Sequence, residues 1–184
     1  MKKFYGLART VSKIIEIIHW VNALLMTGLL ICSLVNGPWL QGFLEQNVPE
    51  YGTMMSVYGF EMVTIGASGQ TDLRGLTLFS AAAAVIFSLM AMVCRNVCLI
   101  LKKSEGATPF QADNIRMVRE IGIFYISVPL FGLAVSVLSR LVIGMDVLEV
   151  SMDLSGLIHG LVVLCLAQFF ARGMDLERDL DGLM

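Results

Sequence analysis

Four stretches of the chain are almost free of charged residues, and more polar segments separate them. They run from about residue 14 to 34, 75 to 101, 121 to 139 and 154 to 171. A helix that crosses the hydrocarbon core of a bilayer needs about 17 to 25 mostly apolar residues, and each stretch reaches that length. We therefore predict an all-α membrane protein in which four transmembrane helices form an antiparallel bundle.

The third apolar stretch continues a charged segment without a break. This segment, residues 108–120, starts with Thr108, Pro109 and Gln111, which match the N-cap, N1 and N3 positions of a helix. Apolar residues then recur at helical spacing, with charged residues between them. We expect the third helix to begin outside the membrane and to project from it as a cytoplasmic extension.

Basic residues are segregated along the chain. Eleven of the thirteen Lys and Arg residues fall in the N-terminal segment, the second connection and the tail, which leaves Arg74 and Arg140 for the other side. Lys and Arg accumulate on the cytoplasmic side of membrane proteins. We therefore expect a bacterial inner-membrane protein with both termini in the cytoplasm and with connections 35–74 and 140–153 outside.

The two outer connections carry strand signals. Residues 54–65 are rich in Val, Tyr, Phe, Met and Ile, which is typical of one or two short strands. Residues 147–152 form a second candidate strand that can pair with the first. Gly37–Pro38 and Gly66–Gly69 predict turns at the two ends of the long connection. These signals favour a small extracytoplasmic cap with short β-strands.

Composition supports the membrane class and narrows the function. Hydrophobic residues make up 57% of the chain and charged residues 15%, whereas about 25% of a soluble domain is charged. The sequence contains no basic patch with interleaved aromatic residues, which is the pattern that would indicate nucleic-acid binding. No paired nucleophile and base, phosphate loop or zinc spacing is present, so we expect no enzyme, no catalytic residue, no cofactor and no metal. Four cysteines in or beside the apolar stretches are expected to be buried thiols: Cys32, Cys94, Cys98 and Cys165.

Polar residues follow one side of the first helix into the membrane. Glu16 and His19 are the ionisable members of this stripe, and ionisable residues at such depth usually face the bundle interior and mark a functional site. One hypothesis joins Glu16, His19 and Arg95 in a cytoplasm-facing cluster that responds to protons or binds a partner. In the alternative, Glu16 pairs with Arg95 or Lys13 near the headgroups and His19 only packs.

The residues around His19 also resemble the first span of bacterial b-type cytochrome membrane subunits, in which this histidine binds haem. The only other histidine is His159. The positions of the two in their spans predict a difference in depth of about 15 Å, from a rise of 1.5 Å per residue. Two histidines that share one iron place their nitrogens roughly 4 Å apart. This geometry argues against a shared haem and an electron carrier.

The second half of the chain contains several short motifs, formed by residues 108–110, Asn114, 116–122, Phe170, Gly173, Leu176, Asp179 and Leu180. These motifs resemble an uncharacterised family of bacterial membrane proteins, the domain-of-unknown-function family twenty-nine seventy-five. The resemblance implies a four-span inner-membrane protein, and it implies no activity, catalytic residue or cofactor.

We therefore expect a non-enzymatic membrane protein that acts through a protein partner in regulation or signalling. Arg116 and Arg119 on the cytoplasmic extension are the candidate contact. Gly156 and Gly160 form a G-x-x-x-G motif for helix packing. A homo-oligomer is a further expectation. The alternative function is a small transporter or channel component with the Glu16 cluster in a wet cavity.

Overall fold

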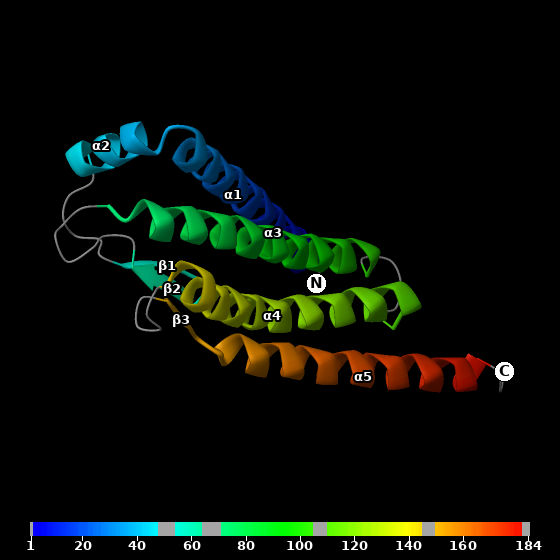
Figure 1. Ribbon diagram of the computed structural model, residues 1–184. Helices are drawn as coiled ribbons and strands as arrows, with labels where there is room; N and C mark the ends of the chain where they lie inside the picture. The colour runs from blue at the N-terminus through cyan, green and yellow to red at the C-terminus, as the bar shows by residue number, and fades with distance from the viewer. Residues whose placement is uncertain (1, 48–53, 64–70, 105–109, 145–149, 182–184) are drawn as a thin grey trace. The chain divides into compact units, whose positions relative to one another are not determined.

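The computed structural model describes residues 2–47, 54–63, 71–104, 110–144 and 150–181. Four of its helices are long and apolar enough to cross a membrane, and a small sheet accompanies them (Figure 1). The chain is a multi-pass membrane protein, and the predicted all-α class with a strand-bearing cap is confirmed. The four long helices are α1 (Lys2–Val35), α3 (Leu73–Lys103), α4 (Ala112–Leu138) and α5 (Ser155–Asp181).

The third long helix, α4, begins later than the sequence predicted. Thr108 and Pro109 lie outside the described residues, but Phe110 and Gln111 are not helical. The backbone carbonyl of Gln111 accepts a hydrogen bond from the N–H of Ile115 at 3.0 Å, so helical bonding starts at Gln111. The prediction of a helix from residue 108 is therefore wrong at Phe110 and Gln111. After Leu138, a short π-helix, η1 (Ser139–Ile143), continues the chain.

Helix α2 (Gly37–Asn47) lies in the long connection where Gly37–Pro38 predicted a turn. The carbonyl of Asn36 accepts the first helical hydrogen bond, from Leu40 N–H at 3.1 Å, so Asn36 is the N-cap. A proline in the first helical turn is tolerated because its missing N–H has no helical partner there. The pair therefore starts a helix, and the predicted turn is wrong. The second turn signal, Gly66–Gly69, lies outside the described residues.

The sheet contains β1 (Met54–Val57), β2 (Phe60–Val63) and β3 (Val150–Met152), antiparallel in the order β1-β2-β3. Tyr58 and Gly59 join the first two strands with φ values of 49° and 77°, as a two-residue type I′ turn requires. The predicted pairing between the two outer connections is confirmed, with Phe60 opposite Met152.

The chain forms two compact units. The helical unit comprises residues 1–19, 89–127 and 155–184, and the sheet unit comprises residues 20–88 and 128–154. One part of each of α1, α3 and α4 belongs to each unit, whereas α5 belongs to the helical unit alone.

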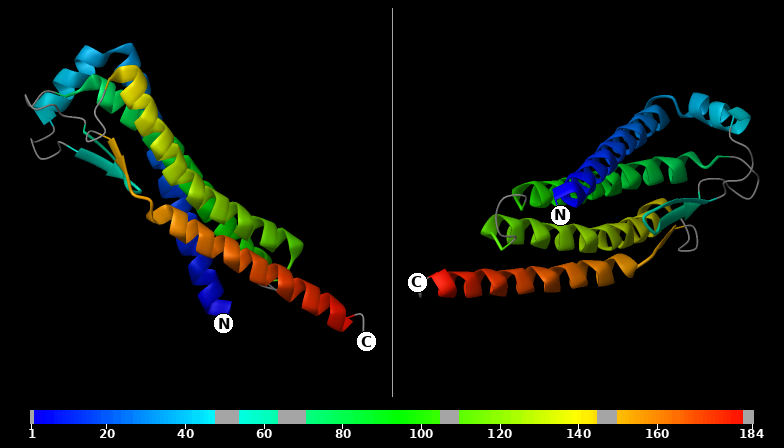
Figure 2. Two further views of the ribbon diagram at one scale, coloured as in Figure 1. Left: turned by 60° about the horizontal axis from the view of Figure 1, so that its bottom comes forward. Right: turned by 180° about the vertical axis from the view of Figure 1, so that it is seen from behind.

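One face of the sheet packs on α3 and α4 within the sheet unit (Figure 2). Phe60 is fully buried, and its ring stacks on Phe79 of α3 with 6.0 Å between centroids. Gly132 of α4 lies so close to the sheet that a Cβ there would be 2.5 Å from the Met152 sulfur. The glycine therefore allows β3 to contact the helix.

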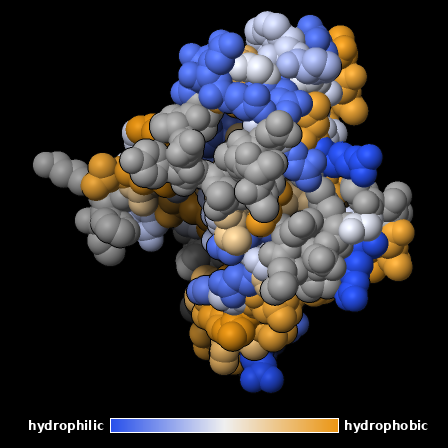
Figure 3. Space-filling view, turned by 60° about the vertical axis from the view of Figure 1, so that its left-hand side comes forward, coloured by the Kyte–Doolittle hydropathy of each residue, from blue (hydrophilic) through white to orange (hydrophobic). Residues whose placement is uncertain are grey.

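Large apolar side chains remain on the surface of the long helices, and Figure 3 shows hydrophobic residues in orange on one face of the molecule. A soluble monomer rarely exposes so many, whereas lipid tails cover such a surface in a membrane. Cys32 and Cys165 are exposed too, so the expectation of buried thiols is wrong for these two. The exposed large apolar side chains include Leu24, Leu25, Leu34 and Val35 of α1, and Ile158 and Phe169 of α5.

Candidate functional site

Glu16 and His19 lie on the buried face of α1, in the helical unit. Their exposed fractions are 6% and 7%, although most of the neighbouring residues on α1 are exposed. Residues three apart share one face of a helix, so the two side chains enter the same interior. Burial of a carboxyl and an imidazole in an apolar helix makes this pair the first candidate site.

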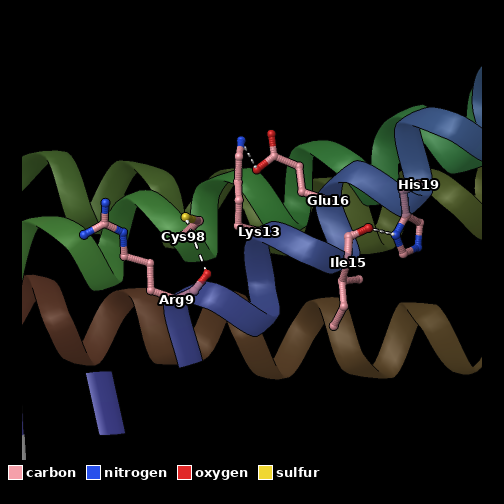
Figure 4. Close-up of polar contacts among 6 residues, drawn as sticks. All are labelled: Arg9, Lys13, Ile15, Glu16, His19 and Cys98. Atoms are coloured by element: carbon pink, nitrogen blue, oxygen red, sulfur yellow. Dashed lines mark hydrogen bonds and ion pairs between the residues drawn. The ribbon is translucent and has the colours of Figure 1, made fainter. Parts of the chain in front are cut away.

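Each of the two side chains has a partner on α1 itself (Figure 4). The Lys13 ammonium donates to Glu16 Oε2 at 2.9 Å, and the Lys13 side chain is more than half exposed. His19 Nδ1 lies 2.7 Å from the carbonyl oxygen of Ile15, one helical turn earlier. This contact fixes the orientation of the imidazole ring.

Arg95 does not join this pair in the described part of the chain. Its side chain is exposed on α3, and no ion pair of Arg95 is found among the described residues. The carboxylate of Glu16 is instead neutralised by Lys13, as in the alternative interpretation of the sequence. A long basic side chain near a helix end commonly directs its charge toward water. The structure brings Glu16 and His19 together and leaves Arg95 outside.

Polar groups from the other helices extend the site across the helical unit. Cys94 of α3 and Tyr125 of α4 are half-buried in the same unit. The Tyr125 ring lies 6.4 Å from the His159 ring of α5. We call these four polar residues of the helical unit, Glu16, Cys94, Tyr125 and the exposed His159, the polar layer. Sequence reasoning missed it because the four residues lie on four helices whose rotation and register the sequence does not give.

The end of α3 and the start of α4 are joined by polar side chains. The amide hydrogen bonds come from two buried asparagines, Asn96 and Asn114, and hold the two helix ends together, whereas the exposed ion pair contributes little. The hairpin therefore presents the first turns of α4 from a fixed base. The three contacts are Lys103 Nζ to Asp113 Oδ2 at 2.6 Å, Asn96 Nδ2 to Glu120 Oε2 at 3.0 Å, and Asn114 Nδ2 to Ser104 Oγ at 3.3 Å.

Arg116 and Arg119 are exposed on this part of α4. Arg116 Nε lies 3.5 Å from Glu120 Oε1, one turn later on the same helix. Exposed ion pairs of this kind contribute about 0 to 1 kcal/mol, so the pair does not withhold Arg116 from another carboxylate. Both guanidinium groups are available on the surface.

Gly160 lies at a close crossing of α4 and α5. A Cβ at Gly160 would be 2.5 Å from Ile126 Cγ1 and 2.8 Å from the carbonyl oxygen of Gly122. Gly122 on α4 is equally confined, because a Cβ there would meet Leu164 at 2.8 Å. Gly156, the first glycine of the predicted motif, is half-buried. The backbones approach closely because both helices have glycine at the crossing.

Among the described residues, no group of three or more His, Cys, Asp and Glu side chains is arranged to hold a metal ion. Comparison of the chain with models of protein families, with curated proteins and with solved structures finds no match.

Proposed function

We propose that this multi-pass membrane protein lies in a bacterial inner membrane, belongs to the uncharacterised four-span family its motifs resemble, and acts without catalysis by binding a protein partner in the cytoplasm. The observation that carries the proposal is the exposure of Arg116 and Arg119 on the firmly anchored start of α4. Arginine pairs with carboxylates in a bidentate geometry, so the partner presents acidic side chains.

The distribution of basic residues supports a cytoplasmic location for Arg116 and Arg119. Eleven of the thirteen Lys and Arg residues fall on the side that also holds the α3–α4 hairpin and both termini. A cytoplasmic partner therefore meets Arg116 and Arg119 together. The three basic residues of this surface, Lys103, Arg116 and Arg119, outnumber its two acidic residues, Asp113 and Glu120, so its net charge is positive.

The test is a tagged purification from native membranes in mild detergent, with the wild type compared with an Arg116→Glu, Arg119→Glu variant. The control is an Arg172→Glu, Arg178→Glu variant, because those arginines are also exposed and lie on α5 on the same predicted side. We expect one stoichiometric partner with the wild type and the control, and its loss from the first variant. Equal recovery with all three proteins, or recovery of the chain alone, would overturn the proposal.

A transport role is the second candidate, and the polar layer favours it. Ionisable groups among apolar helices often mark the path of an ion or a proton, and in the helical unit Glu16 is buried and Cys94 and Tyr125 are half-buried. Proteoliposomes with a trapped pH indicator test this role. Proton flux in the wild type that a Glu16→Gln variant abolishes would put transport first, and equal, background flux in both would exclude proton transport.

A further inference from the structure

Helix α2 has an exposed aromatic face that the function proposed above does not use. Trp39 and Phe43 are 58% and 48% exposed, and their rings stack with 5.6 Å between centroids. Their spacing of four residues places them on one face of the helix. At about 100° per residue, Gln41 and Glu45 occupy the opposite face. The helix is therefore aromatic on one side and polar on the other.

The chain holds α2 close to the end of a transmembrane helix. The N–H of Asn36 donates to the carbonyl of Cys32 in α1 at 2.9 Å, and the carbonyl of Asn36 accepts from Leu40 in α2. One residue thus joins the two helices. The last residues of α1, Leu34 and Val35, are strongly exposed apolar residues. The aromatic face of α2 therefore follows directly on the surface that α1 offers to lipid.

The other sides of α2 contact the rest of the sheet unit. Leu40 is only 4% exposed, and a Cβ at Gly37 would lie 3.1 Å from the Leu73 side chain at the start of α3. Glu45 Oε1 accepts from Gln41 at 3.0 Å and from the backbone N–H of Thr71 at 3.4 Å. These contacts set the rotation of α2, and they leave the aromatic face outward.

We propose that α2 lies in the headgroup region of the bilayer, with Trp39 and Phe43 inserted at the membrane surface where α1 ends. The occupant of the aromatic face is the lipid itself. A helix of 11 residues is only about 16 Å long, too short to cross a core of about 30 Å. Tryptophan favours the interface, where its ring is partly apolar and its N–H finds a partner. The polar face with Glu45 keeps the helix from entering the core.

Tryptophan fluorescence tests this placement directly, because the chain has only two tryptophans. The protein with Trp20→Phe retains Trp39 as its one reporter. It is reconstituted in bilayers whose lipids carry bromine near the headgroups or near the bilayer centre. The control variant, Trp20→Phe, Trp39→Phe, Glu45→Trp, moves the reporter to an exposed position on the polar face of the same helix.

We expect Trp39 to be quenched more by shallow than by deep bromines and to be shielded from a water-soluble quencher. The control reporter should show the reverse, with weak quenching by bromine and strong quenching from water. Shielding from water without quenching by bromine would mean that protein covers Trp39, and it would overturn the proposal. Stronger quenching by deep bromines would also overturn it.

The assay does not depend on one variant. If Trp20→Phe fails to fold, the difference between the wild-type and Trp39→Phe emission gives the contribution of Trp39. The same bromine comparison then applies to that difference. Absence of bromine quenching in the difference spectrum contradicts the proposal in the same way.

Discussion

The ring of Phe110 lies 5.7 Å from the ring of Phe170 and covers the backbone of Gly173. Phe110 precedes α4, whereas the other two residues lie on α5. The three residues come from separate short motifs of the second half of the chain, and the fold brings these motifs into one contact. The contact ties the start of α4 to α5.

The first prediction concerns Gly173. A Cβ there would lie 2.8 Å from two atoms of the Phe110 ring, so Gly173→Ala must displace the ring. We expect a loss of about 1 to 3 kcal/mol in stability from overpacking. Thermal unfolding in detergent, followed by circular dichroism, measures it. In the control, Gly6→Ala, the added methyl has open space, and better helix propensity should raise stability by up to about 1 kcal/mol. A rise in both variants would refute the tight contact.

The crossing of α4 and α5 gives the second prediction. Gly160→Ala would place a methyl group 2.8 Å from the Gly122 carbonyl, and backbone yields less easily than a side chain. We expect a loss of about 2 to 3 kcal/mol, at the upper end for overpacking. The melting temperature relative to Gly28→Ala, whose site is open, provides the comparison. Similar melting temperatures for the two variants would show that the helices separate at no cost.

The third prediction concerns the pair of Lys13 and Glu16. Lys13→Met leaves the buried Glu16 carboxylate without its ammonium partner, and a buried polar group that loses its partner costs about 1 to 3 kcal/mol. Glu16→Gln alone should cost less, because a neutral amide is easier to bury. The double variant, Lys13→Met, Glu16→Gln, should recover most of the free energy of unfolding that Lys13→Met loses. Simple addition of the two single effects would show that the pair contributes nothing.

The fourth prediction concerns Asn96 and Glu120, which join α3 to α4. Asn96 is buried, and its amide donates to the Glu120 carboxylate at 3.0 Å. A double-mutant cycle with Asn96→Ala and Glu120→Ala should give a coupling energy of about 0.5 to 1.5 kcal/mol, the usual net contribution of one hydrogen bond. Chemical unfolding in mixed detergent supplies the four free energies of unfolding. A coupling energy near zero would assign the contact no role in stability.

The sequence predicts the spans and the strand pairing well, for physical reasons. A bilayer crossing leaves a long run without charge, so α3 was visible from residues 75 to 101 and is found at Leu73–Lys103. Helix α2 was missed because Gly37–Pro38 is a signal both for a turn and for a helix start. Only the hydrogen bond from Leu40 to Asn36 distinguishes the two.

The candidate site was predictable only where its contacts are local. Lys13 and Glu16 lie three residues apart on one helix, so their pairing was among the alternatives that the sequence offered. The approach of Tyr125 to His159 depends on the rotation of separate helices about their axes. Hydrophobic periodicity does not give this rotation when nearly every residue of a span is apolar.

Because β2 pairs with β3, the complete sheet can form only when both strands lie on the same side of the membrane. β2 precedes α3 and β3 follows α4, and the backbone N–H of Asp153 donates to the carbonyl of Gly59 at 2.8 Å. The β1–β2 hairpin is synthesised before β3, so the third strand can join the sheet only later. If only one of the two intervening helices crosses the bilayer, β3 emerges on the opposite side and the sheet stays incomplete. In a chain with the wrong number of crossings, β2 therefore has a partner strand on one side only.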